Sequence, residues 1–282
     1  MRILIVGGAS NLAQALKPVL AEFADVITAG RAGCDLYLDL SKPLEKIECT
    51  EYIDVVINTS AKFGDNSLEG ILQTENVNAL GVLRLCQWCS QMKIRHLIQI
   101  SSIFAGLDKH SQFYSFYSLS KKHADELAEL YSSRFGLPLT ILRPAQFYGV
   151  GESFRQHQPF LYTIIDKAAT DQEIQIYGTN DALRNFIHVD DIANIIALVI
   201  KRNIQGTYHC MYPQNVSYSE VAKAAIAAFD SKSALKFMPQ QPDIPDNVFE
   251  FDDSLYRLIN YFPQISIEMG IKKEADYRKG CQ

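Results

Sequence analysis

The sequence predicts an α/β protein, with a Rossmann-type doubly wound parallel sheet and a smaller C-terminal α/β substrate lobe. Two observations lead to this prediction. Apolar, strand-like runs alternate with helical patterns through the first half of the chain, which is typical of a parallel sheet covered by helices. The first run, residues 2–6, is apolar almost throughout, as in a strand that is buried on both faces.

The elements of the first half follow from this alternation. Residues 2–6 lead into a glycine turn, a helix over 11–23 and a second strand over 26–29. Two long helical patterns cover 74–91 and 118–135. The remaining strands of this half are expected at 35–38, 54–58, 96–100 and 138–142. We therefore assign residues 1–146 to a first, Rossmann-type domain.

The pattern changes after Arg143. Helices are expected at 159–169 and 219–229, a proline-rich loop at 239–247, and a frayed polar end at 272–282. We assign residues 147–282 to a substrate-binding lobe, from which the segment 186–199 can return to the main sheet.

Composition and charge exclude several classes of protein. The 282 residues are 48% hydrophobic and 21% charged, which is ordinary for a globular protein. A net charge of -5 gives no basic surface for nucleic acid. No run approaches the roughly 18 apolar residues of a membrane span, and glycines interrupt the N-terminal run too early for a signal peptide. We expect a cytoplasmic protein with no nucleic-acid or membrane partner.

The cysteines and histidines do not suggest a metal site. Cys86 and Cys89 form a Cys-x-x-Cys pair, but they lie within the helical pattern 74–91, and no second pair of ligands is near them in the sequence. We expect both to pack in the core and expect no bound metal.

A glycine turn directly after the first strand indicates a dinucleotide site. Such a site needs a tight turn, a close approach of the backbone to pyrophosphate, and a helix N-terminus that faces the negative charge. Ser10 and Ala13 occupy positions that glycine usually holds. The candidate ligands in this turn are Gly7, Gly8, Ser10, Asn11 and Leu12.

The end of the second predicted strand bears on the choice of cofactor. An acid there binds the ribose 2′-hydroxyl of NAD, whereas this strand is followed by Arg31. The guanidinium suits the 2′-phosphate of NADP, because its planar fork meets phosphate through two hydrogen bonds. The sequence therefore favours NADP(H), with NAD(H) and a merely solvated Arg31 as the alternatives.

A third group of residues points to acid/base chemistry. Tyr117 and Lys121 are four residues apart at the start of a predicted helix and so share one face. A lysine ammonium favours the phenolate and thereby makes a tyrosine a better acid/base near neutral pH. Ser101 and Ser102, at the end of the preceding strand, offer a hydroxyl to a carbonyl oxygen.

Taken together, these motifs resemble those of the extended short-chain dehydrogenase/reductases, the NAD(P)-dependent epimerase/dehydratase family that acts mostly on nucleotide sugars. The resemblance covers nearly the whole chain. The matching segments are GGASNLA (7–13), DVVINTSA (54–61), NVNALG (76–81), ISSIFAG (100–106), YSLSK (117–121), LRPAQFYG (142–149) and RNFIHVDDIA (184–193). Residues 1–146 are then the NAD(P)-binding domain.

The resemblance implies roles for individual residues. Ser102 is expected to orient the substrate carbonyl, Tyr117 to act as acid/base and Lys121 to activate it, with Ser101 as the alternative serine. Gln146, Arg184 and Ser102 are the expected substrate contacts. The further expected cofactor contacts are Asp39, Leu40, Thr59, Ser60, Ala61, Asn78, Ser101, Tyr117, Lys121 and Pro144.

Departures from the family pattern narrow the reaction. Dehydratases carry an Asp-Glu pair after the strand-end hydroxyl, whereas this chain has Ile103 and Phe104 there, which argues against loss of water. Arg31 favours a keto-sugar reductase with Tyr117 as acid/base. The alternatives are a nucleotide-sugar 4-epimerase that retains NAD, and a non-catalytic NADP(H)-binding regulatory protein. The expected partners are a nucleotide-linked sugar and a second copy of the chain, paired through helices 74–91 and 118–135.

Overall fold

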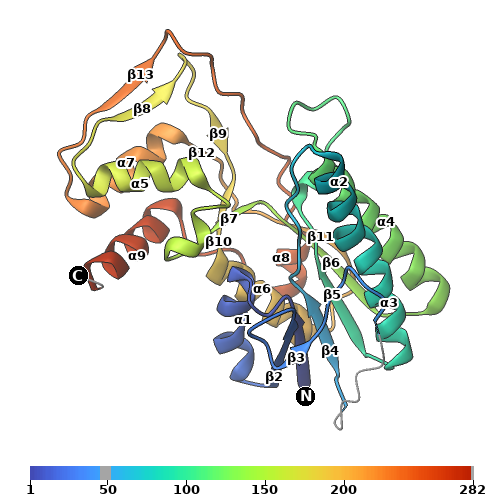
Figure 1. Ribbon diagram of the computed structural model, residues 1–282. Helices are drawn as coiled ribbons and strands as arrows, with labels where there is room; N and C mark the ends of the chain where they lie inside the picture. Colours follow the sequence, from blue (N-terminus) through green and yellow to red (C-terminus); the bar gives the residue numbers. More distant parts are fainter. Residues whose placement is uncertain (45–51, 281–282) are drawn as a thin grey trace. The chain divides into compact units, whose positions relative to one another are not determined.

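The computed structural model describes residues 1–44 and 52–280, which form two compact units (Figure 1). The first unit comprises Met1–Pro144, Ala193–Cys210 and Ser254–Asn260. The second comprises Ala145–Ile192, Met211–Asp253 and Tyr261–Gln282. The division therefore differs from a single cut after residue 146, because two later segments belong to the first unit.

The first unit is built on a seven-stranded sheet in the order β11-β6-β5-β4-β1-β2-β3. Every neighbouring pair is parallel, which confirms the predicted Rossmann-type fold. All residues of the central strands β4 and β5 are buried, as the apolar runs predicted. The strands are β1 (Arg2–Val6), β2 (Asp25–Gly30), β3 (Leu36–Tyr37), β4 (Val55–Asn58), β5 (His96–Ile100), β6 (Leu139–Pro144) and β11 (Gly206–Cys210).

Helices cover both faces of this sheet (Figure 1). On one face lie α1 (Asn11–Ala21) and α6 (Val189–Arg202), and on the other lie α3 (Gly81–Gln91) and α4 (Phe116–Phe135). The core against α3 and α4 contains Cys86, Trp88 and Cys89, all less than 2% exposed. Burial raises the pKa of Cys86 to about 12, which fits a packing role for the Cys-x-x-Cys pair. The short helix α8 (Ser254–Ile259) completes the unit.

The helix predicted over 74–91 begins earlier and contains a π-helical turn. The α-helix α2 (Leu68–Glu75) starts at the Ser67 cap, and the π-helix η1 (Asn76–Leu80) joins it to α3. A π-helical turn alters the regular pattern of backbone hydrogen bonds. Arg84 Nη1 donates to the Asn76 carbonyl at 3.1 Å, so a side chain supports the backbone there. No periodic sequence signal marks such a turn.

The second unit contains small sheets and three helices. Strand β7 pairs in parallel with β10, β8 pairs in parallel with β13, and β9 pairs antiparallel with β12. Helix α5 has the predicted bounds, and α7 begins one residue early. The elements are β7 (Gln146–Tyr148), η3 (Glu152–Phe154), α5 (Pro159–Ala169), β8 (Ile174–Tyr177), β9 (Leu183–Arg184), β10 (Phe186–His188), β12 (Val216–Ser217), α7 (Tyr218–Phe229), β13 (Leu235–Met238) and α9 (Ile267–Gly280).

The return to the main sheet takes a different form from the one expected. In the segment 186–199 the strand β10 pairs with β7 in the second unit, and only residues from Ala193 onward join the first unit, as part of the helix α6. The strand that extends the main sheet is β11, which pairs with β6. The polar β11 sequence GTYHC lacks an apolar run, so periodicity does not identify it.

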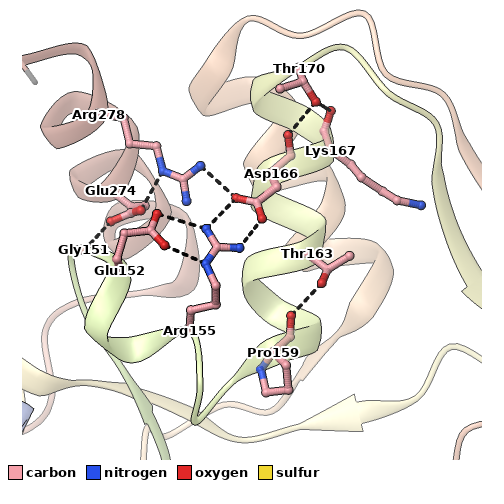
Figure 2. A network of polar contacts seen from close by, with 10 residues as sticks. All are labelled: Gly151, Glu152, Arg155, Pro159, Thr163, Asp166, Lys167, Thr170, Glu274 and Arg278. Carbon is pink, nitrogen blue, oxygen red and sulfur yellow. Dashed lines mark hydrogen bonds and ion pairs between the residues drawn. The ribbon is translucent and has the colours of Figure 1, made fainter. Parts of the chain in front are cut away.

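Of the polar C-terminal end predicted to fray, residues 272–280 belong to the helix α9, and residues 281–282 lie outside the described residues. Figure 2 shows the charged network that holds this helix. Arg278 donates to Glu274 at 2.7 Å within the helix and to Asp166 of α5 at 3.0 Å. Arg155 bonds the same Asp166 and also Glu152, with Arg155 Nε to Glu152 Oε2 at 2.8 Å. The helix thus buries a face that includes Ile267, Ile271 and Ala275, and long-range ion pairs hold its polar residues.

No helix in residues 1–44 and 52–280 is long and apolar enough to cross a membrane.

We expect Asp166→Asn to lower the midpoint of thermal unfolding at pH 7 by about 3 °C, because two arginines lose their shared partner. Burial raises the pKa of Asp166, but hydrogen bonds from Arg155 and Arg278 outweigh it and hold the pKa below 3.8. A depressed folded-state pKa contributes stability that is complete above about pH 5 and is lost as the pH falls through 3.8. Calorimetry should therefore show a weaker fall of the midpoint below about pH 5 in the variant.

The matched control is Asp276→Asn, which removes an exposed carboxylate of α9 that lies 3.6 Å from Lys272. Its midpoint should change little. Equal effects of the two substitutions would show that the network in Figure 2 does not hold the helix.

Candidate active site

The glycine turn after β1 is tight and leads directly into the helix α1. Gly7 has φ of +82°, and the amides of Gly7 and Gly8 donate to the Ala29 carbonyl at 2.8 and 3.1 Å. Ser10 caps α1, because its hydroxyl accepts from the Ala13 amide at 3.2 Å. A serine therefore stands where glycine is usual, and its hydroxyl caps the N-terminus of α1.

Residues after β4 close the other side of this turn. Thr59 Oγ1 lies 2.9 Å from Ser10 Oγ and donates to the Val6 carbonyl at 2.9 Å. A Cβ on Gly7 would lie 2.6 Å from Ser60 Oγ and 2.8 Å from the Ser60 amide nitrogen. The missing side chain therefore lets the chain after β4 pack directly against the turn, and no residue with a Cβ fits here without a shift. The structure thus brings together Gly7, Ser10, Thr59 and Ser60, which the sequence had assigned to the cofactor.

The residues predicted to bind adenosine lie beyond β2. Arg31 is exposed in the turn that follows this strand, and Leu40 is buried. Asp39 accepts from the Ser41 amide and hydroxyl at 3.0 and 2.7 Å. Burial raises the pKa of Asp39, but these hydrogen bonds and the charges of Lys42 and Arg31 leave it below its usual value. Arg31 is thus a solvent-facing cation next to an ionised carboxylate.

Tyr117 and Lys121 are positioned by the first turns of α4. Ser115 caps this helix by accepting from the Ser118 amide at 3.2 Å, which fixes the start of the helix just before the tyrosine. Lys121 Nζ is 5.9 Å from the centre of the Tyr117 ring and donates to the Ile100 carbonyl at 3.0 Å. Lys121 is 2% exposed. Burial lowers the pKa of this lysine to about 8.

The two serines after β5 serve different neighbours. Burial raises the pKa of Tyr117, and the hydroxyl of Ser102 lowers it in part. Burial likewise raises the pKa of Asp125, and the hydroxyl of Ser101 opposes this rise. Ser102 is therefore the serine whose hydroxyl acts on the tyrosine, which favours it over Ser101 for a substrate carbonyl.

Asn78 connects the loop after β4 with α4. It is 2% exposed and lies in the π-helical turn. Its side chain accepts from the Lys62 amide at 2.7 Å and donates to the Lys62 carbonyl at 2.9 Å and the Ser120 hydroxyl at 3.0 Å. Asn78 thus holds the backbone of the loop after β4 next to α4.

Phe63 is the site residue that the sequence did not reveal. Its ring stacks on that of Tyr117, with centroids 4.7 Å apart and planes 19° apart, while 55% of Phe63 stays exposed. The neighbouring Lys62 is held by Asn78, so the backbone clamp positions the aromatic ring. A single aromatic residue in a loop has no periodic signal; only its place five residues after β4 could have drawn attention to it.

The short helix η2 (Ile103–Gly106) follows Ser102 and contains no carboxylate. The acid/base pair that elimination of water requires is therefore lacking at this point of the site.

The remaining predicted cofactor contacts lie on several elements of the first unit. Pro144 lies buried at the end of β6, next to Cys210 of β11 in the sheet register. Ala61 is exposed in the loop after β4. Asn11 and Leu12 open α1, with Leu12 3% exposed.

The predicted substrate contacts Gln146 and Arg184 belong to the second unit. Gln146 Nε2 lies 3.3 Å from Gln158 Oε1, at the start of α5. Arg184 is 6% exposed, donates to the Leu183 and Pro245 carbonyls at 2.7 and 2.8 Å, and lies 4.9 Å from the centre of the Tyr218 ring. These contacts fix the orientation of the guanidinium.

Comparison with known proteins decides the family. Residues 3–210 match the model of the NAD dependent epimerase/dehydratase family. The chain belongs to this family. Several relatives of this family member are named as enzymes that act on nucleotide sugars.

Individual relatives show the range of the family. The chain is 25% identical to Protein CapI of Staphylococcus aureus over 265 residues, which are 83% of this chain and 78% of that protein. It is 24% identical to a dTDP-4-dehydro-6-deoxy-D-allose reductase of Streptomyces bikiniensis over 161 residues, 56% of this chain and 49% of that protein. A UDP-glucuronic acid 4-epimerase from Bacillus cereus in complex with NAD has the same fold, with a TM-score of 0.79, 19% identity, and 100% and 99% of the two chains covered.

No group of three or more metal-ligating side chains occurs in the part of this family member that the structure describes.

We expect Gly7→Ala to destabilise the protein by about 3 kcal/mol, because the methyl group would meet the Ser60 backbone and the positive φ disfavours a side chain. Gly33→Ala is the matched control, since Gly33 has φ of +64° but a Cβ there would meet nothing within 4 Å. That substitution should cost only about 1 kcal/mol. Urea unfolding measures both, and equal losses would show that the space beside Gly7 is not tight.

Proposed function

We propose that this enzyme reduces the ketone of a nucleotide-linked keto-sugar, with NADPH as the preferred hydride donor. The observation that carries this proposal is the arrangement of Tyr117 with Ser102 and Lys121 in a site whose following helix, η2, lacks a carboxylate. These residues suit proton donation to a carbonyl oxygen but not elimination of water.

Each residue of the group has a distinct task in this reaction. The cofactor, when bound, supplies a hydride to the carbonyl carbon. Burial holds the pKa of Tyr117 above its usual value, so the phenol carries its proton at neutral pH and can donate it to the carbonyl oxygen. Ser102 is the hydroxyl that orients this oxygen. The charge of Lys121 then stabilises the phenolate left behind, because opposite charges attract strongly in a buried site.

The choice of a reductase over an epimerase rests on Arg31. An exposed cation just beyond β2 suits the 2′-phosphate of NADP. A reductase that uses NADPH releases the oxidised cofactor after each turnover. The reductase among the relatives supports this choice. The main alternative is a 4-epimerase, which would keep NAD bound and return the hydride to the opposite face of the sugar.

The remaining contacts of the substrate are assigned by the same proposal. Arg184 and Gln146 bind the nucleotide diphosphate and the sugar, since a guanidinium held by backbone carbonyls is a preorganised partner for phosphate. We also propose a homodimer through α3 and α4. The helix α4 exposes 57% of Leu130 and 68% of Phe135, which a partner subunit would cover.

We expect Tyr117→Phe to lower kcat by about 100-fold to 10,000-fold, because the proton donor is lost while the ring and its packing remain. The Kd for nucleotide should stay within about twofold. Stopped-flow assays of keto-sugar reduction and fluorescence titration of NADPH measure the two quantities.

The control for this prediction is Tyr131→Phe, which makes the same change on the same helix at a ring that packs 4.5 Å from Phe135. It should keep full activity. A Tyr117→Phe enzyme with unchanged turnover would instead favour a non-catalytic nucleotide-binding protein.

We expect the purified protein to carry no nucleotide and to bind NADPH more tightly than NADH, with the preference lost in Arg31→Ala. A phosphate that loses its guanidinium partner should bind about tenfold to 100-fold more weakly, while NADH binding should hardly change. Arg134→Ala, at an exposed position near the end of α4, is the control. Retention of NAD through gel filtration, found by mass spectrometry, would point to the epimerase.

A further inference from the structure

The face of α4 that carries Tyr117 and Lys121 continues to a third ionisable residue, Asp125. The three are spaced four residues apart and therefore follow one another along the same side of the helix. The side chain of Asp125 is 1% exposed. The proposed reaction does not use it, and a buried carboxylate costs free energy unless a positive charge compensates it.

Arg143 of β6 is the direct partner of Asp125. Arg143 Nε donates to Asp125 Oδ2 at 2.8 Å, and the arginine side chain is 21% exposed. Burial raises the pKa of Asp125, while the hydroxyl of Ser101 and the charges of Arg143 and Lys121 oppose that effect. One carboxylate thus interacts with two cations, one in direct contact and the other on its own helix.

Asp125 is the carboxylate that acts on the charge of Lys121. In the described structure the ammonium group also donates to the Ile100 carbonyl at 3.0 Å and lies 5.9 Å from the centre of the Tyr117 ring. Burial lowers the pKa of the lysine to about 8, and Asp125 acts in the opposite direction. The charge that the proposed reaction needs on Lys121 is therefore only narrowly maintained.

Among the residues that the structure describes, other elements packed against this part of α4 bring no further charge to Lys121. The helix η2 contains no ionisable side chain, and η1 presents the neutral Asn78. The guanidinium of Arg84 on α3 is bonded to Leu40 and Asn76. Glu75 of α2 pairs with His123, which is 44% exposed.

We propose that Asp125 and Arg143 are a pair of positioning residues with opposite effects, in which the carboxylate keeps Lys121 protonated and the guanidinium limits how strongly it does so. This inference rests on the proposed role of Lys121 as the partner of Tyr117. The inference assigns to Asp125 and Arg143 an effect on the charge of Lys121 that the proposed reaction does not include.

The two substitutions that remove one partner have opposite predicted signs. Asp125→Asn removes a negative charge and leaves Arg143, so Lys121 should lose its proton at lower pH. Arg143→Gln removes a positive charge and leaves the carboxylate to Lys121, so the lysine should keep its proton to higher pH. Charges within about 4–6 Å shift a pKa by roughly 1–3 units, and a full helical turn of separation places the expected shift near the lower end. General damage to the fold would not produce shifts of opposite sign.

The experiment follows the ε-carbon of Lys121 by NMR in protein labelled with [¹³C]lysine, and assigns its signal by its loss in Lys121→Arg. Titration of the full-length protein should give a midpoint about one pH unit lower in Asp125→Asn and higher in Arg143→Gln. Asp125→Glu restores the charge and should return the midpoint to within about 0.3 units of the wild type. The control is Asp25→Asn, which removes the carboxylate of an exposed ion pair with Arg2, 2.6 Å long. This variant should leave the titration midpoint of Lys121 unchanged.

Unchanged midpoints in both variants, or shifts of the same sign, would overturn the proposal. If a single variant fails to fold, Asp125→Glu and the double variant Asp125→Asn/Arg143→Gln still test it, since the double variant should titrate between the two single ones. The readout needs no substrate or turnover. Opposite shifts in a protein without reductase activity would therefore contradict the proposed function alone, and activity without shifts would contradict only this inference.

Discussion

The site depends on keeping a lysine charged between a parallel sheet and the helix that covers it. Removing an ammonium group from water costs several kcal/mol, even after the protein relaxes. The chain offsets this cost with the carbonyl of Ile100, at the end of β5, and with the carboxylate of Asp125, one turn further along α4. Because both groups are fixed by regular secondary structure, the charge is placed where the end of one strand meets the start of one helix.

The same constraint explains why Tyr117 favours donating a proton over accepting one. Burial raises the pKa of the phenol, and Asp125 raises it further, whereas Ser102 lowers it. In the proposed reaction Lys121 would stabilise the phenolate, and the pKa of Lys121, about 8, is close to neutral pH. Proton transfer and the charge of the lysine are therefore coupled. According to the inference above, a change at Asp125 or Arg143 would act on this coupling through Lys121.

Local patterns in the sequence predicted the sheet, the glycine turn and the Tyr117–Lys121 pair. Each of these follows from an apolar run or from a spacing within one element. The pairing of Arg143 with Asp125 spans 18 residues, and that of Arg278 with Asp166 spans 112, so no pattern within a single element reveals either. The polar end of α9 was missed for this reason, since its charged residues pair with a distant part of the second unit, while Ile267, Ile271 and Ala275 lie on its buried face. Phe63 was missed because a loop residue has no period at all.

Strand geometry also accounts for the separate tasks of the two adjacent serines. Successive side chains of an extended chain point in opposite directions, and Ser102 keeps extended angles, with φ of -156° and ψ of 148°. The hydroxyl of Ser102 is accordingly the one that lowers the pKa of Tyr117. The hydroxyl of Ser101 is buried without a hydrogen-bond partner among the described residues. The two adjacent hydroxyls therefore have different surroundings, and only that of Ser102 acts on the tyrosine.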